Sequence, residues 1–269
     1  MQTSSTSQIR KASGYRGLVT SLLMTPILII LLAPSLIIIP MSFTEVPFLS
    51  WPPKGFSAKW YARLFDSPEW LASLWHSLEV ALLSTIIAVL LGVPAGVSLA
   101  LKQWPGKQFV LAFIITPLVV PTIVVGIGMY KIYAWLGLFD RSGLVAAHVM
   151  IGVPLVVVTT MSAARQVNPV LLRAARSLGA GPVSTFFRVT LPIISSGVLS
   201  GAVFAFVSSW DEVVIAKFLS SPTYETAPVR MWAQITERVD PTVAAVSSIL
   251  FTAALLLMIS LMLFERVRR

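Results

Sequence analysis

Charged residues divide this 269-residue chain into long apolar segments. Six stretches contain no Asp, Glu, Lys or Arg and are each long enough to span a bilayer as a helix, which takes about 20 residues. They are Gly17–Thr44, Val80–Leu101, Gln108–Tyr130, Ser142–Ala164, Val189–Trp210 and Pro241–Phe264. Their apolar runs do not alternate with polar residues as the strands of a membrane barrel do. The pattern therefore predicts an all-α integral membrane protein with six transmembrane helices.

Composition supports the same class. The chain is 56% hydrophobic and 12% charged, with a mean hydropathy of +0.85. A soluble domain has about 25% charged residues, and a disordered chain is poor in large aliphatic side chains. Both of these classes are excluded.

The basic residues predict the orientation of the chain. Alternate connections place 12 of the 20 Lys and Arg on the side of both termini, together with only one of the 11 acids, Glu265. Because cytoplasmic loops are enriched in Lys and Arg, both termini are expected to be cytoplasmic. The expected organisation is a cytoplasmic N-terminus (1–16), a first transmembrane helix (17–44), an external loop with an amphipathic segment (45–79), a core of five transmembrane helices (80–264) and a cytoplasmic tail (265–269).

Catalytic chemistry is not indicated. The chain has no cysteine, and its two histidines, His76 and His148, are not paired with other metal ligands or bases. No G-x-x-x-x-G-K-[ST] motif is present, so a nucleotide would have to be bound by another subunit. His148 lies within the fourth apolar run, where an interhelical hydrogen bond is the expected role. The chain is not expected to be an enzyme.

Two pairs of glycines suggest close helix packing. Gly92 and Gly96 are four residues apart in the second apolar run, and Gly197 and Gly201 have the same spacing in the fifth. Glycines at this spacing let helix backbones approach closely. A role in helix packing is therefore favoured over a role in a conformational change.

The connection between the fourth and fifth apolar runs, residues 165–190, contains the pattern of a short helix. Asn168 is a suitable N-cap, Pro169 suits the first turn, and Gly179 lies where a C-cap belongs. Two readings are open for this helix: a surface linker between two spans, or an element that enters a groove on a partner protein.

The spacing within this connection resembles a known motif. Ala174-Ala175, Gly179, Val189 and Leu191-Pro192 match the pattern E-A-A-x3-G-x9-I-x-L-P, the EAA motif of binding-protein-dependent ABC importer permeases. The resemblance implies a coupling helix that docks on a cytoplasmic ATPase. The implied contact residues are Leu171, Arg173, Ala174, Ala175, Arg176, Leu178, Gly179, Leu191 and Pro192. Arg173 replaces the Glu of the motif, so it is expected to face acidic or carbonyl groups of the ATPase.

A second stretch resembles the smaller permease of the spermidine/putrescine systems. It comprises Ser208–Val214 and Phe218–Pro228, which contain that branch's acidic pair and its S/G-P-x-Y-E-x-x-P stretch. Trp210, Asp211 and Glu212 are the candidate pathway or gate residues, because acids at the outer end of a span attract cations. Docking of the external solute-binding protein, or a purely structural role, is the alternative for the acidic pair.

The resemblance implies a subunit of an ATP-driven importer in the bacterial inner membrane. Its partners would be a second permease, expected to be a different chain, two ATPase subunits that use ATP and Mg, and an external solute-binding protein; no nucleic acid is expected. The solute would be a polyamine or a related cationic or amino compound. A permease for another small solute, and an ATP-independent channel or secondary transporter, remain as alternatives.

Overall fold

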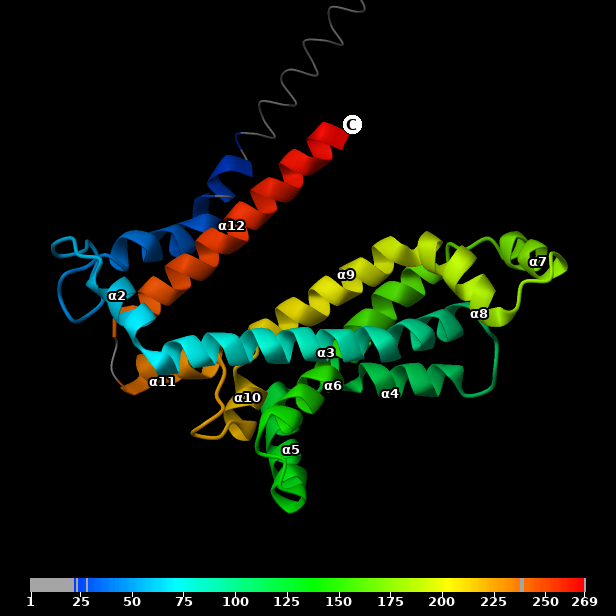
Figure 1. Cartoon of the computed structure of the whole chain (residues 1–269), viewed down its shortest axis with the longest axis horizontal. Helices are drawn as coiled ribbons and strands as arrows, with labels where there is room; N and C mark the ends of the chain where they lie inside the picture. Colours follow the sequence, from blue (N-terminus) through cyan, green and yellow to red (C-terminus); the bar gives the residue numbers. More distant parts are fainter. Residues whose placement is uncertain (1–21, 23, 28, 238–239, 269) are drawn as a thin grey trace, which may run out of the picture. The chain divides into compact units, whose positions relative to one another are not determined.

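The computed structural model describes residues 22, 24–27, 29–237 and 240–268 (Figure 1). Every regular element in these residues is a helix, and the only β feature among them is an isolated bridge between Ser221 and Tyr224. The chain divides into two compact units. One is formed by residues 68–233, and the other by the residues before and after that range.

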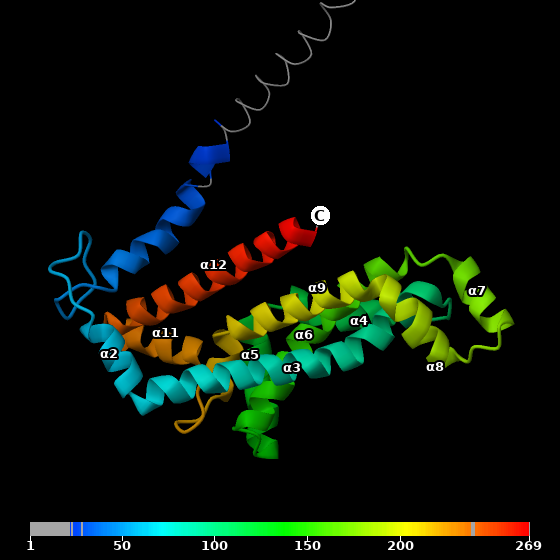
Figure 2. The ribbon, with the colours of Figure 1, turned by 45° about the horizontal axis from the view of Figure 1, so that its top comes forward.

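The larger unit contains most of the helices. They are α3 (Pro68–Leu101), α4 (Lys107–Val119), α5 (Thr122–Leu136), α6 (Arg141–Ala164), α7 (Pro169–Ser177), α8 (Pro182–Thr185), the π-helix η1 (Phe186–Thr190), α9 (Leu191–Trp210), α10 (Val214–Leu219) and the start of α11 (Ala227–Glu237). α3, α6 and α9 run alongside one another in both ribbon views and make the main packing of the unit (Figure 2).

Glycines set the close approach of these three helices. A β-carbon at Gly96 of α3 would lie 2.9 Å from the carbonyl oxygen of Val157 in α6. A β-carbon at Gly197 of α9 would lie 2.5 Å from Cβ of Ala163, also in α6. Real β-carbons do not approach this closely, so only glycine fits. The expected packing role of both glycine pairs is confirmed.

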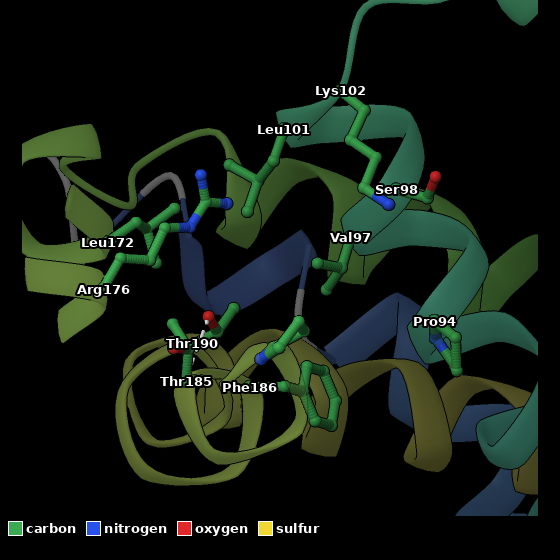
Figure 3. A pocket seen from close by; sticks show the side chains of 11 residues that line it. Pro94, Val97, Ser98, Leu101, Lys102, Leu172, Arg176, Thr185, Phe186 and Thr190 are labelled. Atoms are coloured by element: carbon green, nitrogen blue, oxygen red, sulfur yellow. Dashed lines mark hydrogen bonds between the residues drawn. The ribbon is translucent and has the colours of Figure 1, made fainter. Parts of the chain in front are cut away.

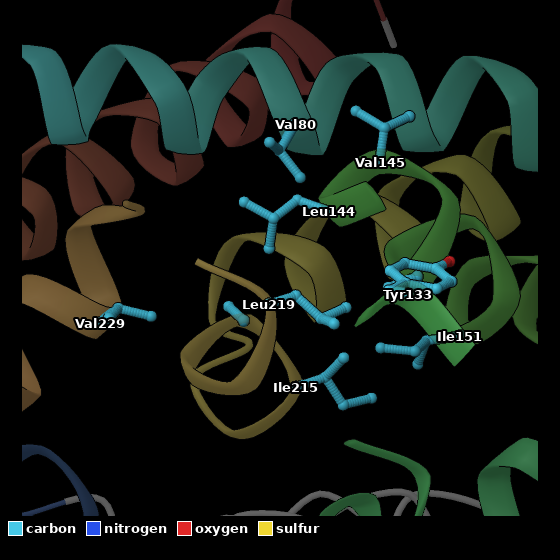
Figure 4. Packing of buried hydrophobic residues seen from close by; sticks show 10 residues of the cluster. Val80, Tyr133, Leu144, Val145, Ile151, Ile215, Leu219 and Val229 are labelled. Carbon is cyan, nitrogen blue, oxygen red and sulfur yellow. The ribbon is translucent and has the colours of Figure 1, made fainter. Parts of the chain in front are cut away.

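A second group of buried side chains joins the short helices to this packing. Val80 of α3 and Leu144 of α6 lie with Ile215 and Leu219 of α10 in one hydrophobic cluster (Figure 4). Tyr133 of α5 belongs to the same cluster. The short helix α10, which directly follows the Trp210–Glu212 segment, is therefore held by the core.

The expected third span, Gln108–Tyr130, is not one straight helix. Its residues fall in α4 and α5, which are bent by 101° at a short break. Val120 at the break is extended, with φ −73° and ψ 133°. Pro121 causes this, because a proline lacks the N–H that would continue the helix and disfavours helical geometry in the residue before it.

Other apolar runs form longer helices than expected. α3 begins at Pro68, before the predicted start at Val80, and α8, η1 and α9 follow one another without a break from Pro182 to Trp210. Four helices of the described residues are long and apolar enough to cross a membrane: Met24–Met41, Pro68–Leu101, Arg141–Ala164 and Pro182–Trp210. The bent pair α4–α5 would be a fifth.

The smaller unit contains the helix Met24–Met41, α2 (Lys59–Asp66) and α12 (Thr242–Arg268). The indole N–H of Trp60 donates to the carbonyl of Thr44 at 2.7 Å, and Arg63 forms an ion pair with Asp240 at 3.2 Å. Asp240 also accepts the backbone N–H of Thr242 at 2.8 Å, which caps α12. The predicted sixth run, Pro241–Phe264, falls almost entirely within α12, and Thr242–Leu256 is its described apolar part.

The glycine packing gives a stability prediction. Gly96→Ala and Gly197→Ala should each lower the free energy of unfolding by about 1–3 kcal/mol, because the added methyl group overpacks the contact with α6. Thermal unfolding of the purified protein in detergent measures the effect. Gly128→Ala is the matched control, because a β-carbon at Gly128 meets nothing within 4 Å. Equal unfolding temperatures for all three variants would contradict the packing role.

Candidate functional site

The connection between α6 and α9 is a capped helix followed by a sharp turn. The side-chain oxygen of Asn168 accepts the backbone N–H of Val170 at 2.9 Å and starts α7. At the other end, the N–H of Gly179 bonds the carbonyl of Arg176, and the N–H of Ala180 bonds that of Ala175. This pair of bonds is the Schellman arrangement, and Gly179 has the positive φ of +81° that it requires.

The predicted coupling residues lie on different faces of this helix. Leu171 is 47% exposed and Leu178 is 88% exposed, and the side chains of Arg173 and Ala174 are also exposed. Ala175 is half-buried. Leu178 is the C-cap of α7 rather than one of its helical residues. Large apolar side chains on a helix that also carries arginines are typical of a surface that binds a partner.

A π-helix joins this connection to α9. In η1 the backbone N–H of Leu191 bonds the carbonyl of Phe186, five residues earlier. Pro192 follows directly and lacks an N–H, so the ordinary helical bond cannot form at the next residue. Leu191 packs against the core of α3, α6 and α9, whereas Pro192 is exposed. π-turns within helices often occur at functional sites.

The second candidate site lies at the other end of α9. Trp210 is half-buried and stacks on Phe206, with ring centroids 5.9 Å apart. Both carboxylate oxygens of Glu212 accept backbone N–H groups of α10, from Ile215 at 2.9 Å and Ala216 at 2.8 Å. Asp211 is exposed. The acidic pair is therefore divided: Glu212 caps a helix, and Asp211 is directed to the surroundings.

Behind this segment, a buried hydrogen-bond chain connects the three packed helices. Nδ1 of His148 in α6 lies 2.6 Å from Oγ of Ser209 in α9, and Oγ of Ser84 in α3 donates to the same serine at 3.1 Å. His148 is 1% exposed. The interhelical hydrogen bond expected for His148 is confirmed.

A network that spacing along the sequence did not predict holds the loop between α10 and α11. The hydroxyl of Tyr224 donates to Glu79 of α3 at 2.7 Å, and Glu79 pairs with Arg141 of α6 at 2.8 Å. Glu225 pairs with Arg230 of α11 at 2.8 Å. Burial, followed by the hydrogen bond to Glu79 and its charge, raises the pKa of the Tyr224 phenol, so the hydroxyl stays a donor at neutral pH.

The ring of His76 stacks on Tyr224 at 3.9 Å, and its Nδ1 lies 3.2 Å from the carbonyl of Glu225. The Tyr224-Glu225 pair stood out in the sequence. Its partners did not, because Glu79, Arg141 and His76 are distant in the chain and belong to no shared motif. Within the described residues no three His, Asp or Glu side chains gather as metal ligands.

Comparisons with known proteins define the class of this chain. Residues 88–269 match the model of the family "binding-protein-dependent transport system inner membrane component". The chain therefore belongs to this family of inner-membrane transport permeases, and it is a multi-pass membrane protein rather than an enzyme.

Among its relatives is the spermidine/putrescine transport system permease protein PotC of Escherichia coli (strain K12), 31% identical over 90% of this chain and 92% of that protein. The putrescine transport system permease protein PotI of the same strain is 30% identical over 83% of this chain and 82% of its own length. A crystal structure of a bacterial ABC transporter that imports alginate has the same fold, with a TM-score of 0.70 at 14% identity, covering 94% of this chain and 97% of the other.

The divided acidic pair gives a second prediction. Glu212→Ala should lower the free energy of unfolding by about 1 kcal/mol, as expected for loss of a helix cap. Asp211→Ala should change it by less than about 0.5 kcal/mol, as for an ordinary surface position. Thermal unfolding in detergent compares the two variants directly, and a larger loss from Asp211→Ala would show that the roles are reversed.

Proposed function

We propose that this chain is a permease subunit of an ATP-driven importer and forms half of a translocation pathway for a polyamine. It crosses the inner membrane six times, with both termini in the cytoplasm, and α7 is the coupling helix that docks on a separate ATPase. The ATPase binds ATP and Mg²⁺, and an external solute-binding protein delivers the solute. The second permease is a different chain.

The observation that carries this proposal is the geometry of the connection between α6 and α9. Leu171, Leu178 and Arg173 are exposed together on a short capped helix. Exposed leucines lose their contact with water only if a partner covers them, which favours docking over a simple linker. Two relatives are named as transport system permease proteins, and a structure with the same fold belongs to an ABC transporter, which supports an ATPase as that partner.

The same geometry supports a route by which a displacement of the docked helix α7 is passed to the membrane helices. α8, η1 and α9 form one run from Pro182 to Trp210, so a displacement of α7 reaches the far end of α9 along a continuous helix. The π-turn at Phe186–Thr190 is a natural place for this helix to bend, because Pro192 weakens the hydrogen bonding there. Val157 and Ala163 of α6 hold the middle of the bundle through the glycine contacts.

Asp211 supports a cationic solute. It is exposed at the outer end of α9, and the ammonium of Lys217 lies over the ring of Trp232, 5.7 Å from its centroid. A carboxylate in this position attracts cations. The two named polyamine relatives point to the same chemistry, and a different small solute of the same family is the alternative.

The coupling role is tested at Gly179. Gly179→Val forces a β-branched residue into a left-handed conformation at a cost of about 1–2 kcal/mol, which should deform the turn after α7. Substrate-stimulated ATPase activity and uptake by the assembled complex in proteoliposomes should fall by roughly five- to thirtyfold.

The control for this experiment is Gly181→Val. Gly181 is also free of neighbours within 4 Å, but its φ is −68°, which any residue can adopt. This variant should keep both activities. If Gly179→Val assembles and leaves ATPase activity and uptake unchanged, α7 is a linker and not a coupling helix.

The role of Asp211 is tested by charge removal. Asp211→Asn should raise the KM for spermidine uptake by roughly two- to fivefold, because one exposed charge contributes about 0.5–1 kcal/mol, and the difference should shrink at high salt. Asp66→Asn, which removes another exposed acid, should have no effect. Unaltered uptake kinetics in Asp211→Asn would remove this residue from the pathway.

A further inference from the structure

A groove opens where α3 ends beside the α7–η1 connection. It has a volume of about 360 Å³ and lies wholly within the larger unit (Figure 3). Val97 and Leu101 of α3, Leu172 of α7 and Phe186 of η1 form its apolar walls. A groove of this size and composition is typical of sites that bind a small amphipathic molecule.

Two cations stand at the rim of this groove. Lys102 directly follows α3, and Arg176 reaches in from α7 (Figure 3). Both side chains are exposed, and neither has an acidic partner among the residues that the structure describes. Paired cations above an apolar wall match a molecule with an anionic head and an apolar tail.

The position of the groove indicates the source of such a molecule. Lys102 marks the end of the apolar α3, and Trp104 lies exposed two residues later. Exposed tryptophan and lysine at the end of a spanning helix are typical of the headgroup level of a bilayer. The opening therefore lies at the membrane–water boundary, on the side that the proposed function makes cytoplasmic.

We propose that this groove binds an anionic phospholipid of the cytoplasmic leaflet. The phosphate lies between Lys102 and Arg176, and an acyl chain follows Val97 and Leu101 along α3. Because Arg176 belongs to α7, the lipid would bridge a spanning helix and the coupling helix. The inference rests on the proposed function only for the side of the membrane on which the groove lies.

Lipid retention tests the proposal without any transport assay. The full chain, co-expressed with its partner permease, is reconstituted in nanodiscs of equimolar phosphatidylglycerol and phosphatidylcholine and then extracted with mild detergent. Mass spectrometry of the retained lipid gives the ratio of the two. Lys102→Gln combined with Arg176→Gln should reduce the phosphatidylglycerol preference by roughly ten- to thirtyfold, as expected for two headgroup contacts of about 1 kcal/mol each.

Arg188→Gln is the matched control. It removes an exposed cation from η1 that does not line the groove, so the preference should be unchanged. An unchanged preference in the double variant, or no preference in the wild type, would overturn the proposal.

Two further results would also overturn it. Displacement of the lipid by inorganic phosphate would indicate a simple anion site. Loss of the lipid when the ATPase binds would make the ATPase the occupant of the groove. Because transport is not measured, failure here leaves the proposed function untouched.

Discussion

The close approach of α6 to α3 and α9 is the contact on which the rest of the structure depends. At Gly96 and Gly197 the helix backbones lie too near for a side chain, so α6 is held between its neighbours without any polar interaction at these points. In a bilayer, burial of apolar surface adds little to helix association, and close packing of small residues is the main source of stability. The α6–α9 connection, the loop between α10 and α11, and the groove are all built on this three-helix frame.

Polar contacts occur at the ends and centre of that frame. His148, Ser209 and Ser84 connect the three helices in the interior, and Tyr224, Glu79 and Arg141 secure the loop beyond α10. Each group has a partner in another element, so the elements are placed in register as well as packed. By contrast, α7 packs against the core through Leu172, while Leu171 and Leu178 stay exposed and are available to a partner.

The sequence predicted the helical membrane class, the glycine packing and the bond of His148, because each depends on local composition or on a polar group surrounded by apolar ones. It also predicted the N-terminal cap of α7 at Asn168 and its end at Gly179. It missed the 101° bend at Pro121, since proline in a span is compatible with a mild kink as well as a full break. It missed the split between Asp211 and Glu212 and the partners of Tyr224, because tertiary contacts decide which acid caps a helix and which groups meet.

The central claim is that this chain works as part of an ATP-driven importer of polyamines. The most direct test is uptake of radiolabelled spermidine and putrescine by proteoliposomes that contain the chain with its partner permease, ATPase and binding protein. The account predicts accumulation only when ATP is present on the ATPase side and the binding protein on the other. Uptake that proceeds without ATP, driven by an ion gradient or by the solute gradient alone, would contradict it and favour a secondary transporter or a channel.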